Sequence, residues 1–167
     1  MTATATAAEP QRRAAWKILE KVKDPEIPVI DIVELGIARD VAIHGEIVEV
    51  TITPTYSGCP AMHTIEQDIR DMLGQAGFTR VRVNTVLSPA WTTDWMTETA
   101  RRKLRDYGIA PPQLPPDGAT AVVEFVPRCP RCNAPGARRI SEFGSTACKA
   151  LYQCRECLEP FDYFKRL

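Results

Sequence analysis

The sequence contains no apolar run that approaches the ~20 residues of a membrane-spanning helix. Its first residues, MTATATAAEP, lack a basic segment followed by an apolar one, so we expect no secretory signal peptide. With 21 basic and 21 acidic residues the net charge is zero, and bulk charge therefore indicates neither a nucleic-acid nor a membrane partner. These absences predict a cytoplasmic protein whose six cysteines are metal ligands or reactive thiols rather than a disulfide framework.

Three catalytic signatures are missing as well. There is no Glu-x-x-His pair of the kind that builds a di-iron site in a helical bundle. There is no glycine-rich dinucleotide fingerprint, and no spacing suggests a Ser–His–Asp arrangement. What remains is a chain of 167 residues, 44% hydrophobic and 25% charged, which is ordinary for a globular protein of one domain, or of one domain and a small module.

The chain is organised around residues 51–73, which read as strand, tight loop and helix. Alternating apolar residues end in a turn rich in proline and glycine, and the apolar residues after Pro60 recur at steps of three and four, which predicts a helix. Cys59 falls at the expected N-cap, where free N–H groups and the helix dipole favour a thiolate. His63 follows one helical turn later. The alternatives are that Cys59 only packs in a loop and that His63 is solvated.

The first half of the chain predicts a small α-β-β-α-β domain. We expect residues 1–10 to be disordered and residues 11–23 to form a helix. Alternation over residues 37–43 and 48–53 predicts a β-hairpin, and residues 81–85 predict a third strand in parallel pairing after the second helix. The core spans roughly 75 residues, near the lower limit for a self-sufficient domain.

An acidic turn lies between the first helix and the hairpin. Asp24 and Glu26 alternate there with Pro25 and Pro28, and their default role is turn chemistry and solvation. Residues 29–35 predict one short helical turn, which stops at a glycine.

A third helix is expected from Thr93 or Asp94 to Tyr107. One of its faces is basic and is either a solvated surface or a docking surface for an acidic partner; it carries Arg101, Arg102, Lys103 and Arg105. The sequence thus predicts an α/β domain over residues 11–109, a proline-rich linker over residues 110–120 and a second module over residues 121–167.

Two Cys-x-x-Cys pairs give the strongest signal in the chain. Cys129 and Cys132 form the first, Cys154 and Cys157 the second, and two such loops supply the four thiolates of a tetrahedral metal site. Zinc is the default metal, although four thiolates also hold iron or an iron–sulfur cluster. Cys148 is either a small core residue or an extra ligand for a labile cluster.

The rest of that module predicts a zinc ribbon. Residues 121–126 read as a short strand, and residues 138–143 and 149–153 can pair as a hairpin between the two cysteine pairs. A module of ~40 residues has too little core to fold without a structural metal.

These segments resemble a known family. The residues that carry the resemblance are DPEIP (24–28), IVELGI (32–37) and the Thr51-x-Thr53 motif that precedes Cys59-Pro60. Residues 11–86 look like the MIP/SufT-type domain associated with iron–sulfur assembly. With FGSTACKALYQC (143–154) between the two cysteine pairs, nearly the whole chain is similar to the PaaD (PaaJ) family, encoded with the multicomponent phenylacetyl-CoA epoxidase of phenylacetate degradation.

The resemblance implies an accessory protein rather than an oxygenase. Members of the family are thought to help mature or supply the metal centres of the epoxidase, whose di-iron oxygenase and reductase subunits are the candidate clients. The resemblance also makes Cys59 a transient ligand for iron or an iron–sulfur cluster, with Asp24 and Glu26 nearby.

Two other functions stay open on the sequence. The protein can be a non-catalytic docking subunit of the epoxidase that uses the ribbon and the basic third helix. It can also be a thiol enzyme that uses Cys59 with His63, although no third, orienting group can be named. A homodimer is compatible with so small a core, yet nothing in the sequence specifies one.

Overall fold

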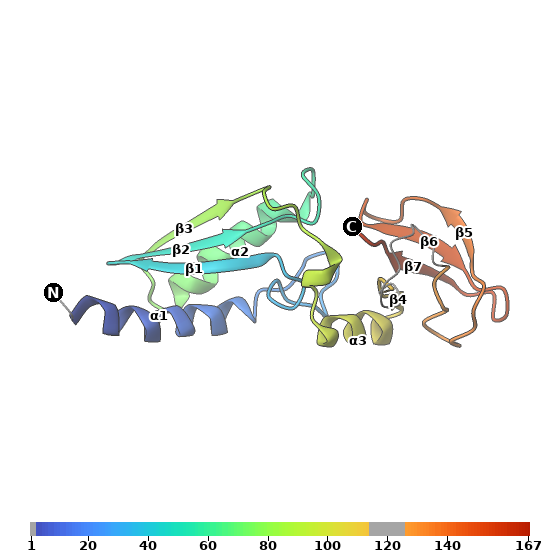
Figure 1. Cartoon of the computed structure of the whole chain (residues 1–167), viewed down its shortest axis with the longest axis horizontal. Helices are drawn as coiled ribbons and strands as arrows, with labels where there is room; N and C mark the ends of the chain where they lie inside the picture. Colours follow the sequence, from blue (N-terminus) through green and yellow to red (C-terminus); the bar gives the residue numbers. More distant parts are fainter. Residues whose placement is uncertain (1–2, 114–125) are drawn as a thin grey trace. The chain divides into compact units, whose positions relative to one another are not determined.

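The computed structural model describes residues 3–113 and 126–167, which form two compact units (Figure 1). The first unit is Met1–Thr97 and the second is Glu98–Leu167. The mixed α/β class expected from the sequence is confirmed in both units. Among the described residues, no helix is both long and apolar enough to span a membrane.

The first unit is built on a three-stranded sheet in the order β1-β2-β3. Strand β1 (Ala38–His44) pairs antiparallel with β2 (Ile47–Ile52), and β2 pairs parallel with β3 (Arg80–Thr85). Along β2 every second side chain is buried, as the period-two pattern of Val48, Val50 and Ile52 predicts. The expected hairpin, and the parallel pairing of its second strand with the third, are therefore confirmed.

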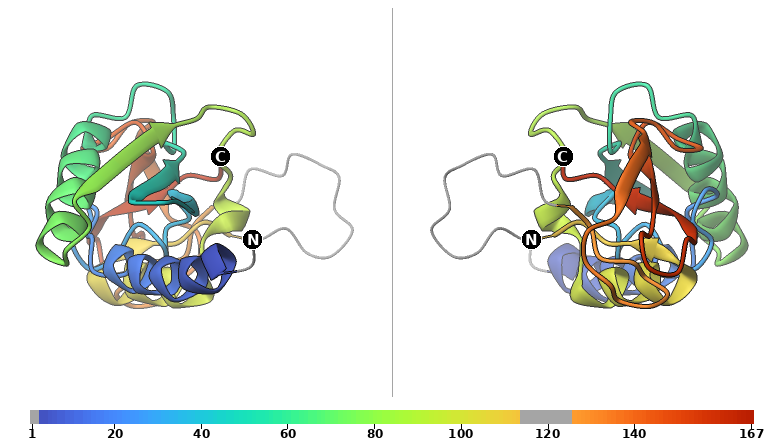
Figure 2. Two further views of the ribbon diagram at one scale, coloured as in Figure 1. Left: turned by 90° about the vertical axis from the view of Figure 1, so that its left-hand side faces the viewer. Right: turned by 90° about the vertical axis from the view of Figure 1, so that its right-hand side faces the viewer.

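Two helices cover one face of this sheet. Helix α1 (Ala3–Leu19) packs against β1, helix α2 (Ala61–Gln75) packs against β3, and the two helices contact one another (Figure 2). The buried side chains of α2 lie three or four residues apart, so they point to the sheet from one face of the helix. Other fully buried residues of this unit come from α1, the loops and the sheet, among them Leu19, Ile30, Ile37 and Ile52.

Helix α1 differs from its predicted bounds at both ends. It begins at Ala3, within the segment expected to be disordered, and it includes Pro10. Alanine has the highest intrinsic helix propensity, and the segment before Pro10 is rich in it. The prediction of disorder rested on the small and polar character of this segment and overlooked that propensity. The helix ends at Leu19 rather than Lys23. The chain turns after Leu19, and Lys23 then forms an isolated antiparallel β-bridge with Asp31.

A reciprocal capping arrangement fixes the turn that follows. Asp31 is buried, and its Oδ1 accepts the N–H groups of Val33 at 3.1 Å and Glu34 at 2.8 Å. In return, Glu34 Oε2 accepts the N–H of Asp31 at 3.3 Å. This is a capping box, and it explains why residues 31–36 form tight hydrogen-bonded turns instead of continuing as a strand. Burial, and then the neighbouring Glu34 carboxylate, raise the pKa of Asp31 above its ordinary value of 3.8.

We expect Asp31→Asn to change how stability depends on pH. Because the folded pKa of Asp31 is raised, the folded state binds this proton more tightly, so its contribution to stability is full at low pH and is lost as pH rises. Asparagine keeps an oxygen that can accept the two N–H groups but cannot ionise. The free energy of unfolding of the variant minus that of the wild type should therefore increase from pH 4 towards pH 7.

This difference can be measured by urea unfolding followed by tryptophan fluorescence. All three tryptophans, Trp16, Trp91 and Trp95, belong to the first unit, so the signal reports that unit alone. The carboxylates that do not interact with Asp31 are common to both proteins and cancel in the difference, so Glu34 is the neighbouring carboxylate whose titration also contributes to it. A difference that does not change with pH would show that Asp31 titrates alike in the folded and unfolded states.

A short 3₁₀ turn, η1 (Thr93–Trp95), packs against the corner before β1. The Trp91 indole N–H donates to the Leu35 carbonyl at 3.2 Å, and the Thr97 N–H donates to the Glu34 carbonyl at 3.0 Å. The Arg39 guanidinium lies 3.4 Å from the centroid of the Trp95 ring. This corner therefore holds residues 91–97 against the start of the sheet.

The second unit holds helix α3 (Glu98–Tyr107) and a four-stranded sheet in the order β4-β7-β6-β5. Strands β5 (Arg138–Ser141) and β6 (Lys149–Gln153) form the hairpin expected from the sequence. Two strands were not predicted. Strand β7 (Pro160–Phe164) pairs antiparallel with β6, and the two-residue β4 (Ile109–Ala110) pairs parallel with β7.

Helix α3 also differs from its prediction. It begins at Glu98, because Trp95 belongs to η1 and Met96 directly follows it. The Thr92 hydroxyl caps the start of η1 by accepting the Asp94 N–H. It is grouped with the ribbon, although the predicted domain over residues 11–109 included it. The predicted linker, 110–120, and the predicted strand, 121–126, fall mostly outside the described residues.

The basic face of α3 is smaller than predicted. Arg101 is buried, and its Nη1 donates to the Pro112 carbonyl at 2.9 Å. Arg102 and Arg105 are exposed, whereas Lys103 is partly buried. The prediction that all four basic side chains lie on one exposed face is therefore wrong for Arg101. The hydrogen-bond acceptor of Arg101 lies in another segment, so the helical periodicity could not reveal it.

Candidate functional site

Cys59 lies where the loop after β2 turns into helix α2. Its N–H donates to the Tyr56 carbonyl at 3.1 Å, and its own carbonyl accepts the Met62 N–H at 3.4 Å. Helix α2 is assigned from Ala61, but Pro60 already has helical angles, φ −68° and ψ −23°. Cys59 therefore stands at the helix N-terminus as expected, with its side chain partly exposed.

The electrostatic environment of Cys59 differs from the expectation. Burial is the largest effect on the Cys59 thiol and raises its pKa, while the N–H groups of Ala61 and Met62 and the Thr55 hydroxyl lower the pKa without reversing the shift. The negative charge of Asp24 raises the pKa further. The expectation of a more easily ionised thiol is therefore wrong, because position at a helix N-terminus says nothing of desolvation. In the free protein Cys59 carries its proton.

The acidic turn contributes one buried carboxylate to this environment. Asp24 Oδ1 accepts the N–H groups of Glu26 at 2.8 Å and Ile27 at 2.9 Å, which is the turn chemistry expected of it. Its charge nevertheless acts on Cys59 and raises the pKa of the thiol. Glu26 and His63 are both exposed, and among the described residues no hydrogen bond joins either side chain to Cys59.

Two threonines belong to this region and were not predicted to have a role. Thr55 is buried, and its hydroxyl interacts with the Cys59 sulfur. The Thr53 hydroxyl is buried without a hydrogen-bond partner in the part of the chain that the structure describes. A buried hydroxyl is normally satisfied, so Thr53 is an exception that calls for a cause. The sequence signals were the Thr51-x-Thr53 motif of the family resemblance and the position of Thr55 in the loop that leads to Cys59.

The second unit brings the four predicted cysteines together. The Sγ atoms of Cys129, Cys132, Cys154 and Cys157 all lie within 4.8 Å of one another. The distance is 3.7 Å between the sulfurs of Cys129 and Cys157 and 3.5 Å between those of Cys132 and Cys154. Four thiolates at about 2.3 Å from a tetrahedral zinc ion would be about 3.8 Å apart. The donor set and its spacing therefore fit a metal site.

The two Cys-x-x-Cys loops have matching backbones. In each loop the N–H of the second cysteine points to the sulfur of the first, at 3.5 Å for Cys132 to Cys129 and 3.5 Å for Cys157 to Cys154. The residue after each second cysteine has a left-handed backbone, with φ 60° at Asn133 and 62° at Leu158. The N–H groups of Cys157 and Glu156 lower the pKa of the Cys154 thiol to about 7, which favours the thiolate that a metal needs.

Cys148 lies outside this cluster. It is buried, and its sulfur is 3.0 Å from the Thr146 hydroxyl oxygen. The first ligand of each pair, Cys129 and Cys154, is also buried and belongs to the apolar core of the unit, whereas Cys132 and Cys157 are exposed. The structure thus assigns Cys148 to packing and keeps it apart from the four ligands.

Comparison with known proteins agrees with this division. Residues 12–85 match the family described as iron–sulfur cluster assembly protein, and residues 114–165 match the PaaD zinc beta ribbon domain. A protein of Escherichia coli K12, provisionally named as one of the subunits of 1,2-phenylacetyl-CoA epoxidase, is 50% identical over 172 residues, which covers 99% of each chain. The chain belongs to the PaaD family.

Other relatives of this PaaD-family chain match its first unit. An Fe-S protein maturation auxiliary factor of Porphyromonas gingivalis is 34% identical over 90 residues, which covers 53% of this chain and 85% of the relative. A crystal structure of a domain of unknown function, DUF59, from Bacillus anthracis has a TM-score of 0.57 at 31% identity and covers 60% of this chain and 97% of that chain. The family expected from the sequence motifs is confirmed, and the four cysteines form a group that could hold a metal ion.

Proposed function

We propose that this PaaD-family protein is an accessory protein of aerobic phenylacetate degradation that helps to mature or insert the iron or iron–sulfur centre of phenylacetyl-CoA epoxidase. In this proposal Cys59 is the transient ligand of the metal or cluster, which is cargo rather than a resident cofactor. The names of two relatives, an epoxidase subunit and an Fe-S maturation factor, support both halves of the proposal. The clients are epoxidase subunits, either the di-iron oxygenase or the reductase. A cytoplasmic location and a homodimer are part of the proposal.

The observation that carries the proposal is the position of Cys59 at the start of α2, partly exposed and within the electrostatic influence of Asp24. A carboxylate that disfavours a thiolate favours a cation in the same place, because the sign of the interaction reverses. Metal binding would displace the thiol proton, as it does for other cysteine ligands. The N–H groups at the start of α2 and the Thr55 hydroxyl would then stabilise the sulfur charge.

The raised pKa of Cys59 also suits a protein that transfers its metal or cluster to a client rather than one that stores it. A thiol that keeps its proton must lose it before it binds metal, so proton competition weakens the complex. One thiolate with a partly exposed sulfur leaves coordination positions open for the ligands of a client. The buried hydroxyl of Thr53, which lacks a partner among the described residues, is a further group that could turn to cargo.

We assign the four-cysteine site a different role, as a structural zinc site. Its two buried ligands are part of the core of the second unit, so release of the metal would disrupt packing. A closed set of four thiolates is typical of structural zinc and leaves no position for exchange. The alternative function, a docking subunit that presents α3, keeps only Arg102, Arg105 and the partly buried Lys103 as its basic surface.

We expect Cys59→Ser to leave the fold intact and to lower the metal or cluster content of the client by about tenfold or more, since removal of even a supporting group around a metal ligand costs about 10-fold. The measurement is the iron content and activity of epoxidase from cells that carry only the variant. Cys148→Ser is the matched control, because it removes a thiol outside both sites. Full metal content and activity with Cys59→Ser would refute the transfer role and leave the docking alternative.

A further inference from the structure

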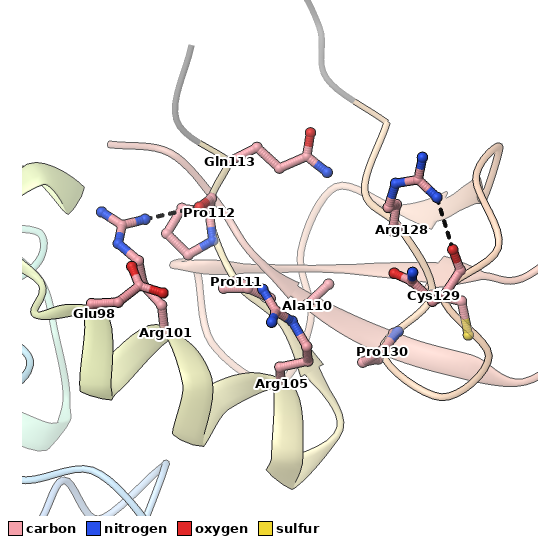
Figure 3. Close-up of a pocket in the computed structure, with 11 residues that line it drawn as sticks. Glu98, Arg101, Arg105, Ala110, Pro111, Pro112, Gln113, Arg128, Cys129 and Pro130 are labelled. Carbon is pink, nitrogen blue, oxygen red and sulfur yellow. Dashed lines mark hydrogen bonds between the residues drawn. The ribbon is translucent and has the colours of Figure 1, made fainter. Parts of the chain in front are cut away.

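The second unit contains a cavity that neither cysteine site explains. It has a volume of about 680 Å³ and lies between helix α3, the segment after β4 and the first cysteine loop, all within this unit (Figure 3). This volume is in the range of ordinary small-molecule sites, about 300–1,000 Å³. The cavity is therefore large enough for a small organic ligand.

Charged side chains line the cavity from two elements. Glu98, Arg101 and Arg105 come from α3, and Arg128 comes from the start of the first cysteine loop. Three of these four side chains are guanidinium groups and one is a carboxylate, so cationic groups predominate among them. A ligand that these groups recognise is therefore expected to be an anion.

Two of the arginines are already held in place. Arg101 is 7% exposed and donates through Nη1 to the Pro112 carbonyl at 2.9 Å. Arg128 donates through Nη1 to the Asn133 carbonyl at 2.9 Å, and the other N–H groups of its planar fork remain geometrically available (Figure 3). Arginines fixed in this way lose little side-chain entropy when they bind an anion.

Part of the remaining wall is apolar and consists of short side chains: Ala110, Pro111, Pro112 and Pro130. The polar residues Gln113 and Asn133, together with Cys129, complete the described lining. Prolines present a rigid surface without a backbone N–H donor, so they suit a carbon framework rather than a second polar group. The cavity thus combines a cationic end with an apolar wall.

We propose that this cavity binds a small organic molecule that carries a phosphate monoester dianion. Arginine forks match phosphate oxygens in bidentate geometry, and an anion suits a lining in which guanidinium groups predominate. The site lies apart from Cys59 along the chain and needs no metal cargo, so the inference is independent of the proposed transfer role.

The test is calorimetric titration of the full-length protein with phenyl phosphate at pH 8 and constant ionic strength. Phthalate, an aromatic dicarboxylate dianion, is the comparison ligand, and neither probe is a strong zinc chelator. Arg105→Ala removes an exposed arginine that lines the cavity. Arg102→Ala is the matched control, because Arg102 is exposed on the same helix, donates to Thr99 Oγ1 at 3.4 Å and does not line the cavity.

We expect saturable binding of phenyl phosphate that Arg105→Ala weakens by about tenfold or more, as the loss of a charge-assisted hydrogen bond does. Arg102→Ala should change the affinity by less than about twofold. Equal losses of affinity in the two variants would show that binding depends only on general surface charge, and this result would overturn the proposal. Absence of saturation up to about 10 mM would also overturn it. Phthalate binding as tight as that of phenyl phosphate would overturn the assignment of phosphate.

Discussion

Replacing Cys129 or Cys154 with serine is expected to abolish metal binding and to unfold the second unit. Both residues belong at once to the four-cysteine group and to the core of the unit, where they are 1% exposed and cluster with Tyr152 and Phe161. Structural zinc contributes about 10–16 kcal/mol to the folding of small zinc modules. A whole domain has a net stability of only about 5–15 kcal/mol, so the unit cannot lose this contribution and remain folded.

Metal analysis and amide NMR spectra would check this expectation. The wild type should hold one zinc ion per chain without visible absorption after anaerobic purification. In Cys129→Ser, amide signals of residues 126–167 should collapse to the dispersion of an unfolded chain, while the tryptophan fluorescence of the first unit stays native. Cys148→Ser is the control and should keep its zinc, since Cys148 lies outside the cluster. A visible iron–sulfur band that depends on these cysteines would overturn the zinc assignment.

Gly36→Ala is expected to destabilise the first unit by about 3 kcal/mol or more. The backbone of Gly36 has φ +80°, which costs a side chain about 1–3 kcal/mol. An added Cβ would also lie 2.8 Å from both the Cβ and the carbonyl oxygen of Trp95. Overpacking of this kind adds about 1–3 kcal/mol. Trp95 cannot easily retreat, because the Thr97 N–H is bonded to the Glu34 carbonyl close by.

Gly77→Ala separates the two causes. Gly77 has φ +97°, yet an added Cβ there would meet nothing within 4 Å. Its loss of stability should therefore reflect backbone strain alone, about 1 kcal/mol. Urea unfolding followed by tryptophan fluorescence measures both variants in the same unit. Equal losses for the two glycines would show that the contact with Trp95 contributes nothing.

The sequence predicted those elements whose signals are local. The alternation of Val48, Val50 and Ile52 and the helical spacing after Pro60 were sufficient for the core of the first unit, because one buried face imposes each period. The four ligands were predicted for a similar reason, since each Cys-x-x-Cys loop sets the positions of its own two sulfurs.

The features that were missed depend on tertiary contacts. Strand β4 has two residues and exists only because β7 pairs with it, so no window of sequence could reveal it. The direction of the Cys59 pKa shift depends mainly on burial, with a smaller contribution from Asp24, 35 positions earlier in the chain. Together these two effects outweigh the lowering by the local helix terminus. Arg101 looked like a surface residue because its acceptor, the Pro112 carbonyl, lies in another segment.

The place of β7 in the second sheet has a consequence for protein synthesis. Strand β7 lies between β4 and β6 in the sheet, but it follows all four cysteines in the chain. Translation adds roughly 5–20 residues per second from the N-terminus, so every ligand leaves the ribosome before the strand that joins the two halves of the sheet. The metal can therefore be captured by a nascent chain whose sheet is still incomplete, and the availability of zinc during translation would then determine how much of this protein folds.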